Sequence, residues 1–241
     1  PLAKTAALMY DVHSVKVSHQ TVANYCNAVA PRVKPFVDGF PYELSDSFCG
    51  DETYVKVGGK WHYIFFFFDA VRKIILSYRV QKHRDWQSAV LAINDVLVKL
   101  KEIPKNLNLI TDGNPIYLLA QQLFAQHNIN FDVTQVVGLT NDDEVSKEFR
   151  PLKQIIERLN RTFKGNYKPT TGYGSDSGAI SHVTLFVAYF NFLRPHSALD
   201  KNVPVVIPEL ETLPNMPAKW LKLIAMSEDY IKAQTLSISR A

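Results

Sequence analysis

The two segments on either side of Gly58-Gly59 restrict the fold more than any other feature of the sequence. In Asp51–Val57, alternate residues share one face, with the period of two that is typical of a strand. Two consecutive glycines suit a tight hairpin turn. Trp61–Phe68 follows and is so continuously apolar that we expect it in the middle of a sheet. With a third strand predicted at Lys73–Val80, the sequence indicates three consecutive antiparallel strands.

After these strands the pattern changes to alternating helices and strands. Helices are predicted at Asp85–Lys101 and Pro115–His127, and strands at Leu107–Thr111 and Phe131–Val137. Three strands followed by this alternation, and then by helices, match the order of a ribonuclease H-like α/β fold, a mixed sheet with helices on both faces. With 241 residues, the chain is long enough to bury the core of such a fold.

Two aspartates occupy particular positions in this predicted sheet. Asp51 lies on the first strand and Asp112 at the carboxyl end of the fourth, and in this layout the two strands are neighbours, so both carboxylates are expected to open on one crevice. Glu52 is an alternative ligand, but by strand alternation it should point away from Asp112 unless the strand bulges. Taken alone, Asp51 has the interpretation of a strand-start residue that caps backbone amides, and Asp112 before Gly113 that of a turn residue. Each acid alone therefore has a structural interpretation.

A third acid, Glu157, lies on a predicted helix. Ile156, Leu159 and Phe163 form an apolar stripe, while Glu157 shares a second stripe with Asn160, Arg161 and Lys164. Between positions 147 and 168 there are seven Lys or Arg residues and two acids. By itself Glu157 has the ordinary interpretation of an ion-paired surface residue. Together with the two aspartates on strands, it favours a metal site.

The chemistry of such a trio follows from its charge. Three carboxylates brought together repel one another unless divalent cations neutralise them, and hard oxygen ligands point to Mg²⁺ or Mn²⁺. Two such ions, about 4 Å apart, activate an attacking water or 3′-hydroxyl and stabilise the leaving oxygen of a phosphodiester. The expected cofactor is therefore magnesium or manganese, with two ions, and the expected reaction is phosphoryl transfer by positioning and electrostatics.

Four motifs carry a family resemblance. Asp51–Val57, Thr111–Gly113 and Ile156–Lys164 resemble the three acidic motifs of DDE transposases, the integrase-type catalytic cores of bacterial and archaeal insertion sequences. Tyr189–Leu199 is similar to the Tyr-Asn-x-x-Arg-Pro-His ending of that family, and the resemblance covers roughly residues 10 to 210. Each motif alone is weak, but four in the right order on a fitting strand pattern are specific.

The resemblance implies DNA transposition, by a cut-and-paste or a replicative route, with Asp51, Asp112 and Glu157 as catalytic metal ligands. It also implies a homo-oligomer assembled on DNA, with element ends and target DNA as partners. Lys164 resembles the basic residue that such enzymes place against the DNA end. Two alternatives stay open: a metal-dependent nuclease of the same fold, and a catalytically inactive DNA-binding descendant.

The spacing of the third acid departs from the family pattern. Many members place about 35 residues between the second Asp and the Glu, whereas 44 separate Asp112 from Glu157. Glu148, at a spacing of 35, is a competitor, but it precedes Arg150-Pro151, where a helix is expected to begin or kink. Only Glu157 has neighbouring residues that match the family motif, with a basic residue, Lys164, seven positions later. We interpret Gly138–Glu144 as a loop that absorbs the surplus.

The N-terminal part is predicted to be a partial helix-turn-helix. Leu2–Tyr10 and Val17–Tyr25 read as helices, the second capped by Ser18, with Val22, Tyr25 and Val29 facing inward. Polar side chains on the first turn of a second helix are what this motif offers to base edges. Over the whole chain, the residues expected to contact DNA are His19, Gln20, Thr21, Asn24, Arg158, Arg161, Lys164, Lys168 and Arg194.

The segment Pro31–Cys49 contains Pro31, Pro35, Gly39 and Pro41, which tend to interrupt helices and strands, so we interpret it as a linker. We therefore assign residues 1–36 to a DNA-binding segment, 37–49 to the linker, 50–200 to the catalytic core and 201–241 to a C-terminal tail with a short helix at Ala218–Met226. Trp61, Trp86 and Trp220 are interpreted as packing residues rather than base-stacking platforms.

Charge and hydropathy agree with a nucleic-acid partner. The net charge is +4, and residues 151–241 carry eleven basic and seven acidic side chains, so the excess lies there. The longest nearly apolar run, Val183–Leu193, is too short to span a bilayer, and no secretory signal pattern is visible. Two cysteines in no metal-ligand spacing indicate reduced thiols. We expect a cytoplasmic, nucleoid-associated protein without a membrane partner.

Overall fold

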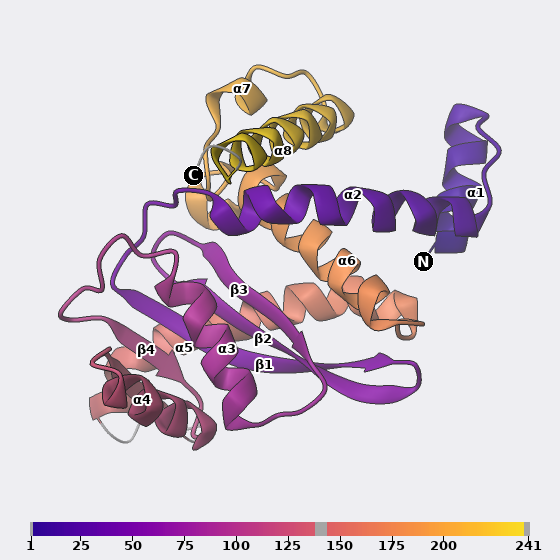
Figure 1. Ribbon diagram of the computed structural model, residues 1–241. Helices are drawn as coiled ribbons and strands as arrows, with labels where there is room; N and C mark the ends of the chain where they lie inside the picture. The colour runs from indigo at the N-terminus through magenta and orange to yellow at the C-terminus, as the bar shows by residue number, and fades with distance from the viewer. Residues whose placement is uncertain (1, 138–143, 239–241) are drawn as a thin grey trace. The chain divides into compact units, whose positions relative to one another are not determined.

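The structure is a computed structural model that describes residues 2–137 and 144–238 (Figure 1). Its strands are β1 (Ser47–Val57), β2 (Lys60–Asp69), β3 (Ile74–Gln81), β4 (Asn108–Thr111) and β5 (Asp132–Gln135). Its α-helices are α1 (Leu2–His13), α2 (His19–Gly39), α3 (Trp86–Leu97), α4 (Ile116–Gln126), α5 (Glu144–Tyr167), α6 (Asp176–Ala188), α7 (Pro208–Glu211) and α8 (Met216–Ile238). Short 3₁₀ helices lie at Lys168–Thr170 and Ser197–Leu199, and a π-helical turn lies at Tyr189–Leu193.

The chain divides into two compact units. Residues 41–56 and 60–164 form one unit, which contains the sheet, and residues 1–40, 57–59 and 165–241 form the other. All the carboxylates discussed below belong to the sheet unit.

The five strands form one sheet in the order β3-β2-β1-β4-β5. β2 and β3 pair antiparallel, whereas β1 with β4 and β4 with β5 pair parallel. Gly58 and Gly59 both have positive φ, 55° and 78°, so they make the turn from β1 to β2 without the steric cost of a Cβ. The predicted strands and their order are confirmed, and the arrangement is ribonuclease H-like.

Helices cover both faces of the sheet. On β2 the ring of Phe66 packs edge-to-face on Phe163 of α5 at 5.4 Å, and the ring of its neighbour Phe67 packs on Tyr117 of α4 at 6.0 Å. Because successive residues of a strand point to opposite faces, α4 and α5 lie on opposite sides. Figure 1 shows α5 passing behind the sheet and α3 in front of it. The residues of β2 from Ile64 to Phe68 are at most 2% exposed, as the unbroken apolar run predicted.

Helix α5 is longer than expected. Its stripe of Ile156, Leu159 and Phe163 is buried, as predicted. The helix begins at Glu144 and continues through Pro151. Of the two expectations for Arg150-Pro151, a helix start there is wrong, while a kink stays a prediction. Pro151 is exposed, and the carbonyl group that lacks its N–H partner can bond to water. Of the predicted loop at Gly138–Glu144, residues 138–143 lie outside the described part of the chain.

In the other unit, α2 differs from the prediction at its C-terminal half. Ser18 caps the helix as predicted, since its side chain accepts a hydrogen bond from the Thr21 amide. The helix continues through Pro31 and Pro35 to Gly39, so the linker interpretation is wrong for these residues. Both prolines lie on the exposed side, where the carbonyl groups that lose an N–H partner are open to solvent, while the opposite side is buried. Tyr25, predicted to face inward, is 68% exposed.

Among the described residues, no helix combines the length and the apolar character that crossing a membrane requires.

Candidate metal centre

Three carboxylates meet at the carboxyl end of the parallel strands. Oxygen atoms of Asp51, Glu52 and Asp112 all lie within 4.8 Å of one another. The parallel pairing of β1 with β4 runs from Ser47 opposite Asn108 to Cys49 opposite Ile110. Asp112 follows β4 directly, and β1 continues beyond the pairing into Asp51. The predicted convergence of the two aspartates from neighbouring strands is therefore present.

The position of Glu52 corrects an expectation. Its side chain was expected to point away from Asp112, yet its carboxylate lies in the same cluster. Asp51 and Glu52 do leave β1 on opposite faces, as alternation requires. However, β4 ends at Thr111 while β1 extends to Val57, so Asp112 lies just past the end of its own strand. Because Asp112 lies past the end of β4, side chains from both faces of β1 can approach its carboxylate.

Asp51 is the most perturbed acid of the cluster. One of its carboxylate oxygens accepts a hydrogen bond from the Glu52 amide at 2.9 Å, and the other from Asn160 Nδ2 at 2.8 Å. Burial, followed by the negative charges of Glu52 and Asp112, raises its pKa to about 7. A buried carboxylate beside two others is stabilised in its charged form by a cation, so this environment fits a divalent ion.

Glu52 is held by the protein itself. Its carboxylate accepts hydrogen bonds from Arg84 Nε, from Asn114 Nδ2 at 2.9 Å and from the Tyr117 hydroxyl at 2.7 Å, and its side chain is only 1% exposed. Burial and the neighbouring Glu52 charge raise the pKa of Tyr117 well above its usual value, which keeps that hydroxyl a donor. With three donors already bound, Glu52 has little capacity left for an ion.

Arg84 links two members of the cluster. Its guanidinium binds Glu52 and also approaches Asp112 Oδ2 at 3.4 Å. The other Asp112 oxygen accepts from the Asn114 amide at 3.0 Å, and the Asp112 side chain is 27% exposed. One internal cation therefore offsets part of the charge of three carboxylates, and Asp112 remains accessible from solvent.

Asn160 places α5 against the cluster, and the sequence did not single it out as a site residue. While its Nδ2 donates to Asp51, its Oδ1 is buried with no hydrogen-bond partner among the described residues. An unpaired buried oxygen is costly and suits a water or a hard cation. The available clue was its membership of the stripe shared with Glu157. The carboxylate oxygens of the cluster, which Asn160 helps to position, are the hard donors that fit Mg²⁺ or Mn²⁺.

Glu157 lies outside the cluster of three. It is exposed, three residues before Asn160 on α5, which is about 4.5 Å along the helix axis. Glu148 is also exposed and outside the cluster, but twelve residues before Asn160, about 18 Å along the axis. Of the two competing acids, only Glu157 is within one helical turn of the residue that touches Asp51.

The predicted DNA contacts are divided between the two units. In the sheet unit, Arg158 and Arg161 are exposed on α5, and Lys164 donates to the Tyr54 carbonyl oxygen with its ammonium 3.7 Å from the Tyr54 ring centre. In the other unit, Lys168 is exposed and Arg194 lies 5.6 Å from the Phe190 ring centre. On the first turns of α2, His19, Gln20 and Asn24 are exposed and Thr21 is half-buried.

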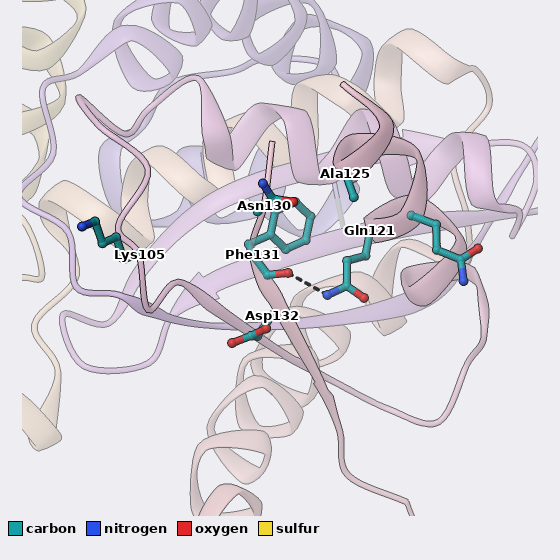
Figure 2. Close-up of a pocket in the computed structure, with 7 residues that line it drawn as sticks. Lys105, Gln121, Ala125, Asn130, Phe131 and Asp132 are labelled. Atoms are coloured by element: carbon teal, nitrogen blue, oxygen red, sulfur yellow. Dashed lines mark hydrogen bonds between the residues drawn. The ribbon is translucent and has the colours of Figure 1, made fainter. Parts of the chain in front are cut away.

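A separate cavity of about 340 Å³ lies at the opposite end of the sheet (Figure 2). Lys105, Gln121, Asn130 and Phe131 are among the residues that line it, and Gln121 Nε2 donates to the Phe131 carbonyl oxygen at 2.6 Å. Because Lys105 precedes β4 and Asp132 begins β5, the cavity is at the amino ends of these strands, away from Asp112. It shares no residue with the acidic cluster.

A family model and several solved structures are similar to this chain. A family model described as a DDE domain, that of IS240-type transposases, matches residues 45–171, while no curated protein matches the chain. A chain of the simian T-cell lymphotropic virus intasome, solved by cryo-EM with PP2A regulatory subunit B56 gamma, is 16% identical with a TM-score of 0.48. That match covers 72% of this chain but only 57% of the other.

Two further structures are integrase catalytic core domains. That of HTLV-2 integrase, in complex with magnesium in a trimeric form, is 14% identical with a TM-score of 0.41, covering 66% of this chain and 94% of that one. That of BIV integrase is 14% identical with a TM-score of 0.43, covering 66% and 91%.

The sheet order and its acidic cluster define a ribonuclease H-like protein with carboxylates gathered where two parallel strands end. Within that class, the chain belongs to the DDE domain family of transposases, since the family model spans more than half of it. Membership of this family supports a metal-dependent polynucleotidyl transferase.

Proposed function

We propose that the chain is a transposase that cleaves DNA strands at element ends and joins the resulting 3′-hydroxyl groups to target DNA. One observation carries this proposal: Asp51 and Asp112, on neighbouring parallel strands of a DDE-family chain, bring their carboxylates within 4.8 Å. If Asp112 served only to form a turn, its position beside the carboxylate of Asp51 would be unexplained. The metal ligands in this proposal are Asp51, Asp112 and Glu157.

When bound, Mg²⁺ or Mn²⁺ ions, two in number, supply Lewis-acid activation of the attacking oxygen and stabilisation of the leaving one. The chain's own residues orient the carboxylates. Asn160 fixes one oxygen of Asp51, and Arg84 with Tyr117 holds Glu52 as a positioning residue behind the aspartates. A rotamer change at Glu157, within one turn of Asn160, brings the third carboxylate toward the aspartates.

The proposed partners are element-end DNA and target DNA, bound by a homo-oligomer. In the sheet unit, the exposed Arg158 and Arg161 lie on the same helix as Glu157, so they offer positive charge to the phosphates that flank the reacting bond. The first two turns of α2 offer polar side chains to base edges, which is the role proposed for His19, Gln20, Thr21 and Asn24.

The decisive experiment compares Glu157→Gln with Glu148→Gln in a cleavage assay on end-labelled DNA carrying the element ends, with Mg²⁺. We expect Glu157→Gln to reduce cleavage by about 10³-fold or more while DNA affinity is retained, and Glu148→Gln to keep nearly full activity. Full activity of Glu157→Gln together with loss in Glu148→Gln would assign the third ligand to Glu148. Joined products, rather than hydrolysis alone, distinguish a transposase from a simple nuclease.

One observation favours a second candidate, a catalytically inactive DNA-binding descendant: Glu157 is exposed and stands apart from the aspartates. This candidate predicts DNA binding that does not depend on Mg²⁺ and no cleavage under any condition. It further predicts that Asp112→Asn changes neither property. Metal-dependent cleavage that is lost in Asp112→Asn would exclude it.

A further inference from the structure

Two exposed aromatic rings stand beside the acidic cluster, on the β1–β2 hairpin. Tyr54 is 57% exposed and Trp61 is 52% exposed, and their rings pack edge-to-face at 5.2 Å. The Lys164 ammonium lies 3.7 Å from the Tyr54 ring centre, and the Lys56 ammonium lies 5.0 Å from the Trp61 ring centre. We call these four residues the hairpin patch. Trp61 was interpreted from sequence as a packing residue, and its exposure corrects that interpretation.

The hairpin patch continues the face of β1 that carries Glu52. Alternation places Glu52, Tyr54 and Lys56 on one face, opposite the buried Thr53 and Val55. At Glu52 this face is covered, because the Tyr117 hydroxyl of α4 bonds to its carboxylate. Two residues further the same face is exposed. Tyr54 therefore lies about 7 Å along the strand from Glu52, or about two base-pair steps of DNA.

The lysines identify the kind of partner. The Lys164 ammonium also donates to the Tyr54 carbonyl oxygen, so it is held at this hairpin, and both ammonium groups place positive charge directly beside the exposed rings. Rings flanked by cations are unsuited to an apolar protein core or a lipid interior, whereas aromatic platforms inside a positive groove are typical of single-stranded nucleic-acid binding. Arg158 and Arg161, exposed on the helix of Lys164, extend the positive charge.

We propose that the hairpin patch stacks unpaired bases of a DNA end, within two nucleotides of the phosphodiester held at the acidic cluster. This inference rests on the proposed function, because it places a DNA end at that cluster. Tyr54 and Trp61 supply the stacking surface, and Lys56 and Lys164 bind the adjoining phosphates. The substrate class is thus a frayed or overhanging end rather than a continuous duplex.

A first experiment observes the ring directly. The chain contains three tryptophans, so Trp86→Phe with Trp220→Phe leaves Trp61 as the only one. In EDTA, a duplex with three unpaired thymidines at its end should quench the emission of Trp61 in a saturable way, and the same duplex with a flush end should quench it much less. Equal response to both duplexes would overturn the proposal. So would emission that depends on protein concentration and not on DNA, which would make the patch a contact between copies.

A second experiment measures the preference for unpaired ends as a ratio of dissociation constants, again in EDTA. Because stacking contributes about 1–3 kcal/mol per base, Tyr54→Ala and Trp61→Ala should each lower the ratio by about 5- to 150-fold. The matched control is Leu119→Ala, an apolar residue on α4 that is 47% exposed, which should keep the ratio. Thermal unfolding of each variant checks that these exposed substitutions leave the fold intact.

The outcomes separate this inference from the proposed function. If the wild-type protein cleaves element ends with Mg²⁺ but the ratio is unchanged in Tyr54→Ala and Trp61→Ala, the inference fails and the function stands. If the wild type neither binds nor cleaves DNA, both fail. A ratio that falls in both variants and is kept in Leu119→Ala supports the hairpin patch as the stacking site.

Discussion

The side-chain amide of Asn160 donates a 2.8 Å hydrogen bond to the carboxylate of Asp51, across 109 positions in the chain. This bond fixes the register of α5 against the end of β1 and thereby the distance of Glu157 from the aspartates. Residues that orient a metal-binding carboxylate typically change metal affinity or activity by about 10- to 100-fold when they are replaced.

We therefore expect Asn160→Ala to lower Mg²⁺-dependent cleavage by about 10- to 100-fold and to raise the Mg²⁺ concentration for half-maximal activity, with DNA affinity unchanged. Gln154→Ala, an exposed amide on the same helix, is the control and should behave as the wild type. An Asn160→Ala enzyme with wild-type metal dependence would show that the amide does not position Asp51 for metal binding.

Arg84 offsets the charge of Glu52 and Asp112, so its removal should expose that charge to added cations. Arg84→Gln leaves the buried Glu52 without its charged partner, and we expect a loss of about 1–3 kcal/mol in the free energy of unfolding in EDTA. Mg²⁺ should then raise the unfolding temperature more in Arg84→Gln than in the wild type, measured by differential scanning fluorimetry.

The matched control for that variant is Arg79→Gln. Arg79 makes a two-pronged ion pair with Asp95 at 2.7 Å, outside the acidic cluster. Its replacement should also lower the free energy of unfolding, but the Mg²⁺-induced rise in unfolding temperature should equal that of the wild type. Equal Mg²⁺ shifts in Arg84→Gln and Arg79→Gln would mean that Arg84 does not compete with the cation.

The pH dependence of stability should report Asp51. Its pKa is raised to about 7, so between the ordinary pKa near 3.8 and pH 7 the folded protein retains a proton that the unfolded chain releases. The folded state therefore loses stability from this group as the pH rises through that range. Asp51→Asn should be more stable than the wild type at pH 8.5 in EDTA, by on the order of 2–4 kcal/mol, and the difference should vanish near pH 4.

The same carboxylate should make Mg²⁺ stabilisation pH-dependent. An ion binds the deprotonated form, so the Mg²⁺-induced rise in unfolding temperature should be larger at pH 8.5 than at pH 6 in the wild type and strongly reduced in Asp51→Asn. Urea titrations at several pH values, with and without Mg²⁺, measure both effects. A pH-independent Mg²⁺ shift would contradict the assignment of Asp51 as a ligand.

Gly50 makes room for the residues that support Glu52. A Cβ at this position would lie 2.4 Å from the ring of Phe67, which packs on Tyr117, the donor to Glu52. Gly50→Ala should therefore cost about 1–3 kcal/mol in the free energy of unfolding and reduce cleavage, because the overpacked ring displaces β1 next to Asp51.

Gly165→Ala is the opposite case and serves as its control. Gly165 lies in α5 with nothing within 4 Å of the added Cβ. We therefore expect Gly165→Ala to raise the free energy of unfolding by about 0.5–1 kcal/mol through helix propensity alone. Chemical denaturation of the two variants tests the expected loss of stability in Gly50→Ala and the expected gain in Gly165→Ala. A neutral Gly50→Ala would show that the Phe67 ring moves aside without cost.

Much of the sheet could be predicted from sequence because period and polarity determine strands locally. The unbroken apolar run before Asp69 required a strand covered on both faces, and the two glycines required a tight turn. Helix limits were less predictable. Pro31 and Pro151 were interpreted as signs of a linker and of a helix start or kink, but each lies within a helix on its exposed face. There, a proline leaves the unpaired carbonyl group open to solvent.

The sequence by itself determined the succession of strands and helices along the chain, the apolar stripe of α5 and the candidate acids, since these follow from residue periodicity and motif. Only the tertiary structure decided which carboxylates meet. Where β4 ends before β1, Glu52 reaches Asp112 from the face opposite to Asp51, and Asn160, not Glu157, touches Asp51. Strand lengths and helix register set these distances, and both depend on contacts between residues far apart in the chain.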